Sequence, residues 1–497
     1  MADNITDGAA GACLQRGFDL HRAGQTDAAE PCYRAALQLR PEFPAAWSYL
    51  GLLRMAAGAL DEAEQHQREA LRLDPAFPDA HNGLGVVHYQ LGRVAEAENC
   101  FRGCLRLWPE HPGANLNLAV ALQSHGRLQE AEAGYRDALR LGSDAAQVHN
   151  NLSVLLRELG RAEEAEANCR EALRLRPDMA DAQANLAMVL LLTGRWAEAW
   201  PFYEARWQTG DLAAARSAFV SPLWTGEQPV AGRTILLHAE QGLGDTLQFC
   251  RYAPLVAARG AHVVLEVQPP LVRLLAGLQG IAQVVAQGDA LPPFDLQCPL
   301  MSLPRAFATT PETVPGKLPY LTADPALAEA WRAALAVLPG RRVGLVWAGS
   351  ARTMQPHAAA LDRRRSMRLA DMAPLASVRG CSFVSLQLGP PAAQLAAPPE
   401  GMFVHDVAHR LGDFADTAAV MANLDLVITV DTASAHLAGA LGRPVWLLNR
   451  FDTCWRWLLN RDDSPWYPSL RQFRHDGQEG WASVMQRVAD ALDGAVA

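Results

Sequence analysis

The chain has 497 residues, half of them apolar, which is enough for two to four domains with cores of ordinary size. The formal net charge is −9 and the one tight basic cluster is 363–365, which argues against a nucleic-acid partner because such proteins need a concentrated basic surface. The nine cysteines are scattered without a CxxC pair, which argues against a disulfide framework or structural zinc and favours a reducing compartment. The sequence opens without a signal-peptide pattern, and its apolar runs are shorter than the roughly 18 residues of a membrane span, so we expect a cytoplasmic protein.

Glycine recurs every 34 residues over the first two fifths of the chain, and alanine, leucine and most of the prolines keep the same step. The recurring glycines are Gly24, Gly58, Gly92, Gly126, Gly160 and Gly194. Each unit is predicted to be two helices, because glycine accepts the positive φ of a tight turn and proline cannot continue a helix. The pattern resembles the tetratricopeptide repeat family, which implies an all-α solenoid of six repeats over residues 10–207.

Asparagine recurs at the same step, at Asn117, Asn151 and Asn185. Equivalent residues on stacked helix pairs form a ladder along one face, and a side-chain amide can both donate to and accept from the backbone of an extended peptide. The ladder resembles that of O-linked N-acetylglucosamine transferases, which implies a protein acceptor along the concave face. The alternative is that the asparagines are only solvated polar residues, since Tyr49 and Gly83 interrupt the ladder in earlier repeats.

A different pattern begins after a linker over 208–231, where apolar runs of strand length alternate with helical segments. We predict strands within 233–240, 261–268, 281–288, 342–349, 381–389, 425–431 and 443–449. Continuous Val, Ile and Leu runs are typical of a parallel sheet covered on both faces. A helix over 324–338 separates two groups of strands, which predicts two doubly wound lobes at 232–338 and 341–497. Ligands of such sheets bind at the carboxyl ends of the strands, so the expected site is the cleft between the lobes.

The first predicted strand ends in a glycine loop that contains an aspartate. Gly242 and Gly244 allow a tight turn and leave room for a ligand. Asp245 is predicted to open the next helix, and Gln248 three residues later completes a capping-box pattern. Asp245 therefore has two interpretations, a helix cap or a carboxylate at the cleft that accepts a proton from an attacking hydroxyl.

A strand of the second lobe ends in the sequence VDTASAH, which is predicted to start a helix. Free N–H groups at a helix start favour phosphate, and the Thr432 and Ser434 hydroxyls can add hydrogen-bond donors. The alternative is again helix capping, by Asp431 or Thr432. A Ser-His-Asp triad is a weaker interpretation, because Asp431, Ser434 and His436 are crowded into six residues without a G-x-S-x-G elbow.

Two further segments of the second lobe are rich in arginine or in aromatic residues. The loop over 347–367 holds small residues and arginines that either meet phosphate charge or lie in solvent as surface residues. The aromatic-rich tail over 454–475 is predicted to pack beneath a loop through Trp455, Trp457, Trp466 and Tyr467.

The segments GLGD and VDTASAHLAGALGRP together resemble the heptosyltransferase-type glycosyltransferases, over about residues 232–475. That resemblance implies a GT-B fold of two Rossmann-like lobes, with Asp245 as the general base. It implies a donor-binding set of Gly242, Gly244, Gly349, Arg365, Ser366, Asp431, Thr432, Ser434 and His436. The pair Arg365-Ser366 is the match to the family's basic residue after the first strand of lobe two, in a loop that is longer here.

The repeats and the segments HAEQGLGDTLQFCRY and SPWYPSLRQFR differ from true heptosyltransferases and resemble bacterial repeat-containing glycosyltransferases, which include flagellin-modifying enzymes. We therefore expect transfer from a nucleotide sugar to Ser or Thr of a protein. The absence of a D-x-D motif predicts a mechanism without a divalent metal, and a single displacement predicts inversion at the anomeric carbon. We expect no cofactor besides the nucleotide sugar itself as substrate.

Two rival functions remain open at this stage. One is a non-catalytic scaffold with a degenerate sugar-nucleotide-binding domain, and the other is transfer to a glycan or lipid. The donor is equally open, since a hexosamine on uridine diphosphate and a nonulosonic acid on cytidine monophosphate both suit an anion site. The sequence leaves the oligomeric state undetermined.

Overall fold

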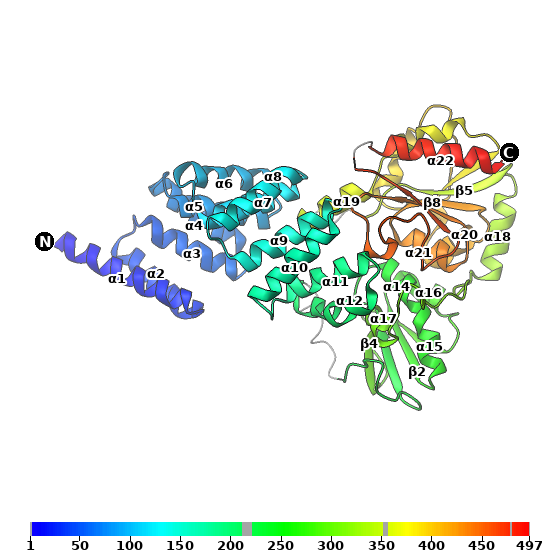
Figure 1. The fold of residues 1–497 in the computed structure, drawn as a ribbon, viewed down its shortest axis with the longest axis horizontal. Helices are drawn as coiled ribbons and strands as arrows, with labels where there is room; N and C mark the ends of the chain where they lie inside the picture. The colour runs from blue at the N-terminus through cyan, green and yellow to red at the C-terminus, as the bar shows by residue number, and fades with distance from the viewer. Residues whose placement is uncertain (1, 211–220, 351–355, 478–479, 497) are drawn as a thin grey trace. The chain divides into compact units, whose positions relative to one another are not determined.

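The computed structural model describes residues 2–210, 221–350, 356–477 and 480–496 (Figure 1). The chain divides into two compact units. One comprises Met1–Leu159, Arg174–Arg176 and Ala351–Leu361, and the other comprises Gly160–Leu173, Pro177–Ser350 and Asp362–Ala497. Among the described residues, no helix combines the length and the apolar character needed to cross a membrane.

The repeat region folds into twelve helices that form six consecutive pairs. They are α1 (Ala2–Arg22), α2 (Thr26–Leu39), α3 (Pro44–Ala56), α4 (Leu60–Leu73), α5 (Pro78–Gln90), α6 (Val94–Leu107), α7 (Pro112–Ser124), α8 (Leu128–Arg140), α9 (Ala145–Glu158), α10 (Ala162–Leu175), α11 (Ala180–Leu192) and α12 (Trp196–Tyr203). The six recurring glycines all have φ between 74° and 82° in the turn inside each pair, as their spacing predicted. The recurring alanines, from Ala29 to Ala199, are all fully buried, because only a methyl group fits where the paired helices meet. The region is a tetratricopeptide-type solenoid.

The four-stranded sheet is parallel throughout, in the order β3-β2-β1-β4. Its strands are β1 (Thr234–His238), β2 (His262–Val267), β3 (Ile281–Ala286) and β4 (Leu296–Pro299). The associated helices are α14 (Leu243–Phe249), α15 (Ala253–Ala258), α16 (Val272–Leu275) and α17 (Leu303–Ala306). Helix α18 (Pro325–Leu335) lies beside helix α20 (Phe414–Met421) of the six-stranded sheet instead. Strand β1 is internal, so its carboxyl end lies in the middle of the row formed by the carboxyl ends of the strands.

The six-stranded sheet is also parallel, in the order β10-β9-β8-β5-β6-β7. Its strands are β5 (Arg341–Val346), β6 (Cys381–Ser385), β7 (Val404–Asp406), β8 (Leu426–Val430), β9 (Val445–Asn449) and β10 (Leu470–Arg474). The associated helices are α19 (Pro356–Arg365), α20 (Phe414–Met421), α21 (Ala433–Ala440) and α22 (Gly480–Val496). Adjacent β5, β8 and β9 bring their carboxyl ends to one edge of the sheet. The fold is thus an α-helical solenoid followed by an α/β region with two parallel sheets, as expected.

One aromatic cluster belongs to both the last repeat and the α/β region. Trp196 of α12 stacks on Trp466 with ring centroids 5.2 Å apart, and it meets Trp455 edge-on at 5.7 Å. Phe249 of α14 stacks on Trp455 at 6.3 Å. The four tail aromatics are buried, as predicted, and Trp455 and Trp466 pack against the repeat helix α12.

Candidate active site

The glycine loop after β1 starts helix α14 two residues earlier than the sequence predicted. The N-cap is Gly242, and its N–H donates to Asp245 Oδ2 at 3.0 Å. Asp245 therefore occupies the third helical position, and the prediction that it opens the helix was wrong. Asp245 stabilises this earlier start, because its side chain accepts from the N-cap backbone as the third residue of a capping box does. Asp245 closes the first turn while its side chain stays 21% exposed.

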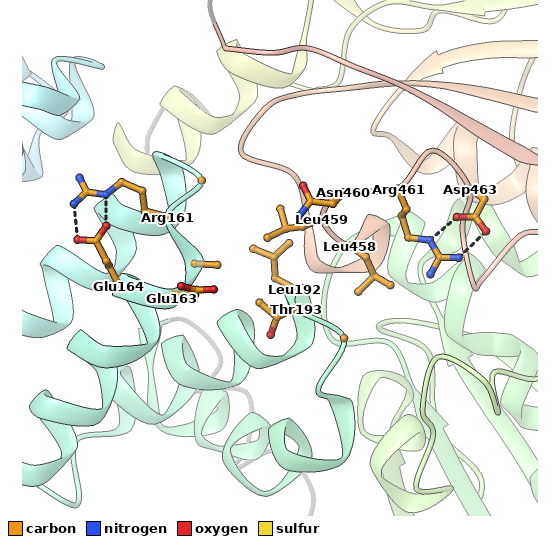
Figure 2. A pocket seen from close by; sticks show the side chains of 13 residues that line it. Arg161, Glu163, Glu164, Leu192, Thr193, Leu458, Leu459, Asn460, Arg461 and Asp463 are labelled. Carbon is orange, nitrogen blue, oxygen red and sulfur yellow. Dashed lines mark hydrogen bonds and ion pairs between the residues drawn. The ribbon is translucent and has the colours of Figure 1, made fainter.

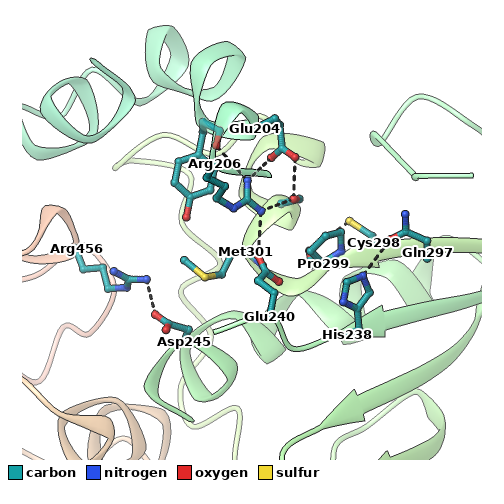
Figure 3. Close-up of polar contacts among 12 residues, drawn as sticks. Glu204, Arg206, His238, Glu240, Asp245, Gln297, Cys298, Pro299, Met301 and Arg456 are labelled. Carbon is teal, nitrogen blue, oxygen red and sulfur yellow. Dashed lines mark hydrogen bonds and ion pairs between the residues drawn. The ribbon is translucent and has the colours of Figure 1, made fainter. Parts of the chain in front are cut away.

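The second oxygen of the Asp245 carboxylate accepts a hydrogen bond from Arg456 Nη2 at 2.5 Å (Figure 3). Arg456 lies in the short 3₁₀ helix η9 (Trp455–Trp457), which follows β9 in the second sheet. Sequence reasoning missed this arginine because it lies inside a segment whose aromatic residues indicated packing alone. The contact spans 211 residues of chain, and no local pattern marks it.

The two segments that carry the family resemblance are in contact. A Cβ added to Gly244 would lie 2.9 Å from His436 Cδ2 and 3.4 Å from the Cα of Ala433. Helices α14 and α21 therefore approach closely only because residue 244 has no side chain. This packing brings the Asp245 loop of the first sheet to the helix start after β8 of the second.

His436 is buried, with 4% of its surface exposed. Its Nδ1 lies 3.0 Å from the hydroxyl oxygen of Tyr467, and its ring stacks on Trp457 at 5.3 Å. Burial holds the pKa of His436 well below its ordinary value, and the charges of Arg456 and Arg251 lower it further. The side chain is therefore a neutral brace for the turn. The donor contact implied by the family resemblance stays a prediction.

The start of α21 has an N-cap residue whose side chain does not cap it. Thr432 has extended backbone angles but makes no capping hydrogen bond, and its Oγ1 lies 3.2 Å from Thr429 Oγ1 instead. The side chains of Asp431, Thr432 and Ser434 are all half-buried, so they are reachable from solvent. A helix start that lacks a side-chain cap, with hydroxyl groups beside it, is suited to an anion.

The loop after β5 brings together the three other predicted donor-binding residues. Gly349 N donates to Ser366 Oγ at 3.1 Å, and a Cβ at Gly349 would lie 2.8 Å from Arg365 Nη2. Arg365 also pairs with Asp362 at 2.9 Å. Because β5 lies next to β8, this group lies at the sheet edge that also carries Asp431.

A further basic group at this edge was not predicted. Arg450, directly after β9, is 8% exposed, and its Nε lies 3.6 Å from Asp452 Oδ1. Among the described residues, its Nε and Nη1 have no hydrogen-bond partner. Arg364 Nε donates to the other oxygen of Asp452 at 3.0 Å. The edge therefore combines the buried Arg450 and the half-buried Arg364 and Arg365 with the helix start of α21.

Figure 3 also shows a buried ion cluster at Glu240, two residues before Gly242. Glu240, fully buried, accepts from Arg206 Nη2 at 2.9 Å, and burial raises the pKa of Glu240 to about 7. Arg206 also pairs with Glu204 at 2.8 Å. Both partners belong to η1 (Glu204–Gln208), directly after the last repeat helix. At the end of β1, His238 contacts Gln297 Oε1 at 3.0 Å, and burial lowers the pKa of His238 to about 4.

A cavity of about 800 Å³ lies apart from these residues (Figure 2). It is lined by Gly160, Arg161, Ala162, Glu163, Glu164, Leu192, Thr193, Gly194, Leu458, Leu459, Asn460, Arg461 and Asp463. In Figure 2 two ion pairs flank a centre of leucine side chains. Leu458 and Asn460 both have positive φ, 54° and 52°, a conformation that is strained for leucine but that asparagine adopts more readily. None of the predicted site residues lines this cavity.

The three ladder asparagines occupy the first helix of their repeats, on α7, α9 and α11, and all are half-buried. Asn117 Nδ2 donates to Asn82 Oδ1 of α5 at 2.9 Å. Asn151 Oδ1 accepts from Gln147 Nε2 at the same distance. Asn82 extends the polar row, and the sequence missed it because it lies one position before the 34-residue register.

Comparison with known proteins divides the chain in the same way. Residues 10–190 match the family described as cilia and flagella-associated protein 70 C-terminal domain, a tetratricopeptide-type family, and residues 391–449 match glycosyltransferase family 9 (heptosyltransferase). The second match contains β8, the start of α21 and β9. The chain is a tetratricopeptide-type repeat array fused to a region like glycosyltransferase family 9. Asp245 and Arg365 lie outside the matched residues.

The chain is also similar to individual proteins over parts of its length. Protein FlbA of Caulobacter vibrioides is 29% identical over 318 residues, which cover 59% of this chain and 52% of that protein, so the match spans about half of the relative's length. A thermophilic TPR protein of Thermus thermophilus is 24% identical with a TM-score of 0.34, covering 37% of this chain and 100% of that one. Pseudomonas aeruginosa pilF is 20% identical with a TM-score of 0.35, covering 40% and 89%. The family 9 match supports a transferase.

Proposed function

We propose that the protein transfers a sugar from a nucleotide-sugar donor to a Ser or Thr hydroxyl of a protein acceptor bound by the repeat array, with flagellin as one candidate acceptor. The observation that carries the proposal is the packing of Gly244 on Ala433 and His436. This packing places the loop that carries the Asp245 carboxylate beside the start of α21, which has no side-chain cap. The chain also matches glycosyltransferase family 9. The repeat array, together with its half-buried asparagines, supports a protein as acceptor rather than a glycan or lipid.

In the proposed reaction, the donor phosphates lie at the start of α21, where backbone N–H groups, the Thr432 and Ser434 hydroxyls and Arg365 stabilise their charge. The acceptor oxygen attacks the anomeric carbon, the bond from that carbon to the phosphate oxygen breaks, and the nucleotide leaves as an anion. Asp245 takes the proton of the acceptor hydroxyl. One displacement inverts the anomeric carbon, and the fixed positive groups take the place of a divalent metal.

The decisive experiment compares donor binding and transfer in Asp245→Asn. A panel of nucleotide sugars is first screened by thermal shift, and we expect at least one to raise Tm. Asp245→Asn keeps that shift but loses transfer by roughly 10²- to 10⁴-fold, because the base is gone while the phosphate site is intact. Asp289→Asn, an exposed change in the same lobe, is the matched control and keeps full activity. A chelator leaves the wild-type rate unchanged.

Each contrary outcome removes a separate part of the proposal. Undiminished transfer by Asp245→Asn rules out the base. A panel in which every nucleotide sugar leaves Tm unchanged removes the transferase and favours a scaffold. Loss of activity on chelation, restored by a divalent ion, removes the metal-independent mechanism.

A further inference from the structure

We infer that Arg456 is a positioning residue that fixes the Asp245 carboxylate for proton transfer. This inference rests on the proposed function. The two groups come from different sheets of the α/β region, since Asp245 lies on α14 after β1 and Arg456 lies on η9 after β9. Their contact therefore ties the reactive carboxylate to the lobe that is proposed to hold the donor.

The carboxylate is held at both of its oxygens. Oδ2 accepts from the Gly242 backbone, and Oδ1 accepts from Arg456 Nη2. These two bonds suppress rotation of the group about its terminal torsion. Each carboxylate oxygen offers about two acceptor positions, so a proton can still be taken by a group fixed in this way. The side chain is 21% exposed, which leaves it open to an acceptor.

The guanidinium group is itself fixed by its surroundings. Arg456 Nε donates to Gln248 Oε1 at 2.7 Å, and Nη1 lies 3.1 Å from Cys454 Sγ. The guanidinium carbon Cζ lies over the Trp455 ring, 4.8 Å from its centroid, and 5.6 Å from the centroid of the Phe249 ring. A planar fork of this kind can hold two acceptors and stack at once, whereas a lysine ammonium cannot.

The charges around the pair leave Asp245 as the one acidic group that Arg456 contacts among the described residues. Glu240 is occupied by Arg206, and His436 is held neutral by its burial. The hydroxyl of Tyr203 is also uncharged, because burial raises its pKa above the ordinary range. This buried hydroxyl has no hydrogen-bond partner among the described residues. A buried guanidinium that lost its carboxylate would be costly, so the pair persists as a unit.

The test is a double-mutant cycle on transfer by the full chain, with Asp245→Asn and Arg456→Ala made singly and together. A residue that acts through another loses its effect once the other is gone. We expect Arg456→Ala to lower kcat by roughly 10- to 100-fold with the donor KM within about threefold of wild type, since misplacing a reactive group carries losses of this size. In the Asp245→Asn background the same change lowers kcat by less than about threefold. Arg456→Lys keeps the charge without the fork and recovers only part of the rate.

Arg251 gives the matched control. It is a buried arginine of the same aromatic cluster, with its guanidinium 5.4 Å from the Trp466 ring, but it donates to the Trp466 backbone oxygen rather than to a carboxylate. Arg251→Ala lowers Tm with no such dependence on residue 245. Millimolar guanidinium restores part of the Arg456→Ala rate, which a purely structural loss would not allow.

Two outcomes would overturn the inference. One is an Arg456→Ala loss of equal size in both backgrounds, and the other is a loss confined to the donor KM. If wild-type protein transfers no sugar, the proposed function fails and the positioning role fails with it. In that case the midpoint of urea unfolding still tests the contact. If the two substitutions have additive effects on that midpoint, Asp245 and Arg456 do not stabilise each other and the contact is also ruled out.

Discussion

Burial shifts the pKa values of two ionisable residues at the end of β1 in opposite directions. Burial lowers the pKa of His238 to about 4 and raises the pKa of Glu240 to about 7, because a low-dielectric interior disfavours either charged form. Glu240 contributes stability that is complete below its unfolded pKa of about 4.5 and is lost as pH rises toward 7. His238 behaves in the opposite way, since its unfolded form takes up a proton first as pH falls below about 6.5.

His238→Asn should therefore reduce the sensitivity of the fold to acid. Between pH 7.5 and pH 5 the depressed pKa of His238 removes about 2 kcal/mol of unfolding free energy from wild type, with the loss complete near its folded pKa. The variant lacks this part of the pH dependence, even if the substitution also changes the unfolding free energy by the same amount at both pH values. Urea unfolding at the two pH values measures the difference, and His262→Asn, an exposed change at the start of β2, keeps the wild-type slope. Equal slopes in wild type and His238→Asn would contradict the assignment.

At the scale of elements, the site depends on how closely α14 approaches α21. Gly244→Ala should separate them, because its methyl group would meet the buried and stacked ring of His436 at 2.9 Å. We expect a loss of about 1–3 kcal/mol in unfolding free energy, typical of overpacking, together with a lower transfer rate. Gly277→Ala is the matched control, because a Cβ there meets nothing within 4 Å, and the change should be neutral or slightly stabilising. Wild-type stability and rate in Gly244→Ala would show that the helices are free to separate.

The position of each strand in its sheet explains which strands could be predicted from the sequence. All seven predicted strands form, and the three that were missed, β4, β7 and β10, each lie at the edge of a sheet. Internal strands are covered on both faces and so have continuous apolar runs, whereas edge strands are short or mixed in polarity. The site divides in the same way. Gly242, Asp245 and the start of α21 belong to local motifs, but Arg456 and Arg450 acquire their positions only from contacts between distant segments.

At the scale of the whole molecule, the proposal separates acceptor recognition from chemistry. Replacing Asn117, Asn151 and Asn185 together by alanine should raise the KM for a protein acceptor by roughly 10- to 2,000-fold, since each of the three lost hydrogen bonds costs about 0.5–1.5 kcal/mol. Donor binding and transfer to a short Ser-containing peptide should be unchanged. Asn168→Ala, on the second helix of its repeat, is the control. An unchanged KM for the protein acceptor would show that the ladder is only a solvated polar face.

The aromatic cluster around Trp196 joins the last repeat to the α/β region, so the whole repeat array cannot be exchanged as one unit. Trp196 and Trp200 are almost completely buried, and both touch Trp455, the neighbour of Arg456. A fragment that began at residue 208 would remove these two rings and leave Trp455 and Trp466 facing water. Chimaeras that exchange the recognition repeats must therefore retain α11 and α12 with the transferase region. The end of the repeat pattern in the sequence and the end of the separable unit are different places in this chain.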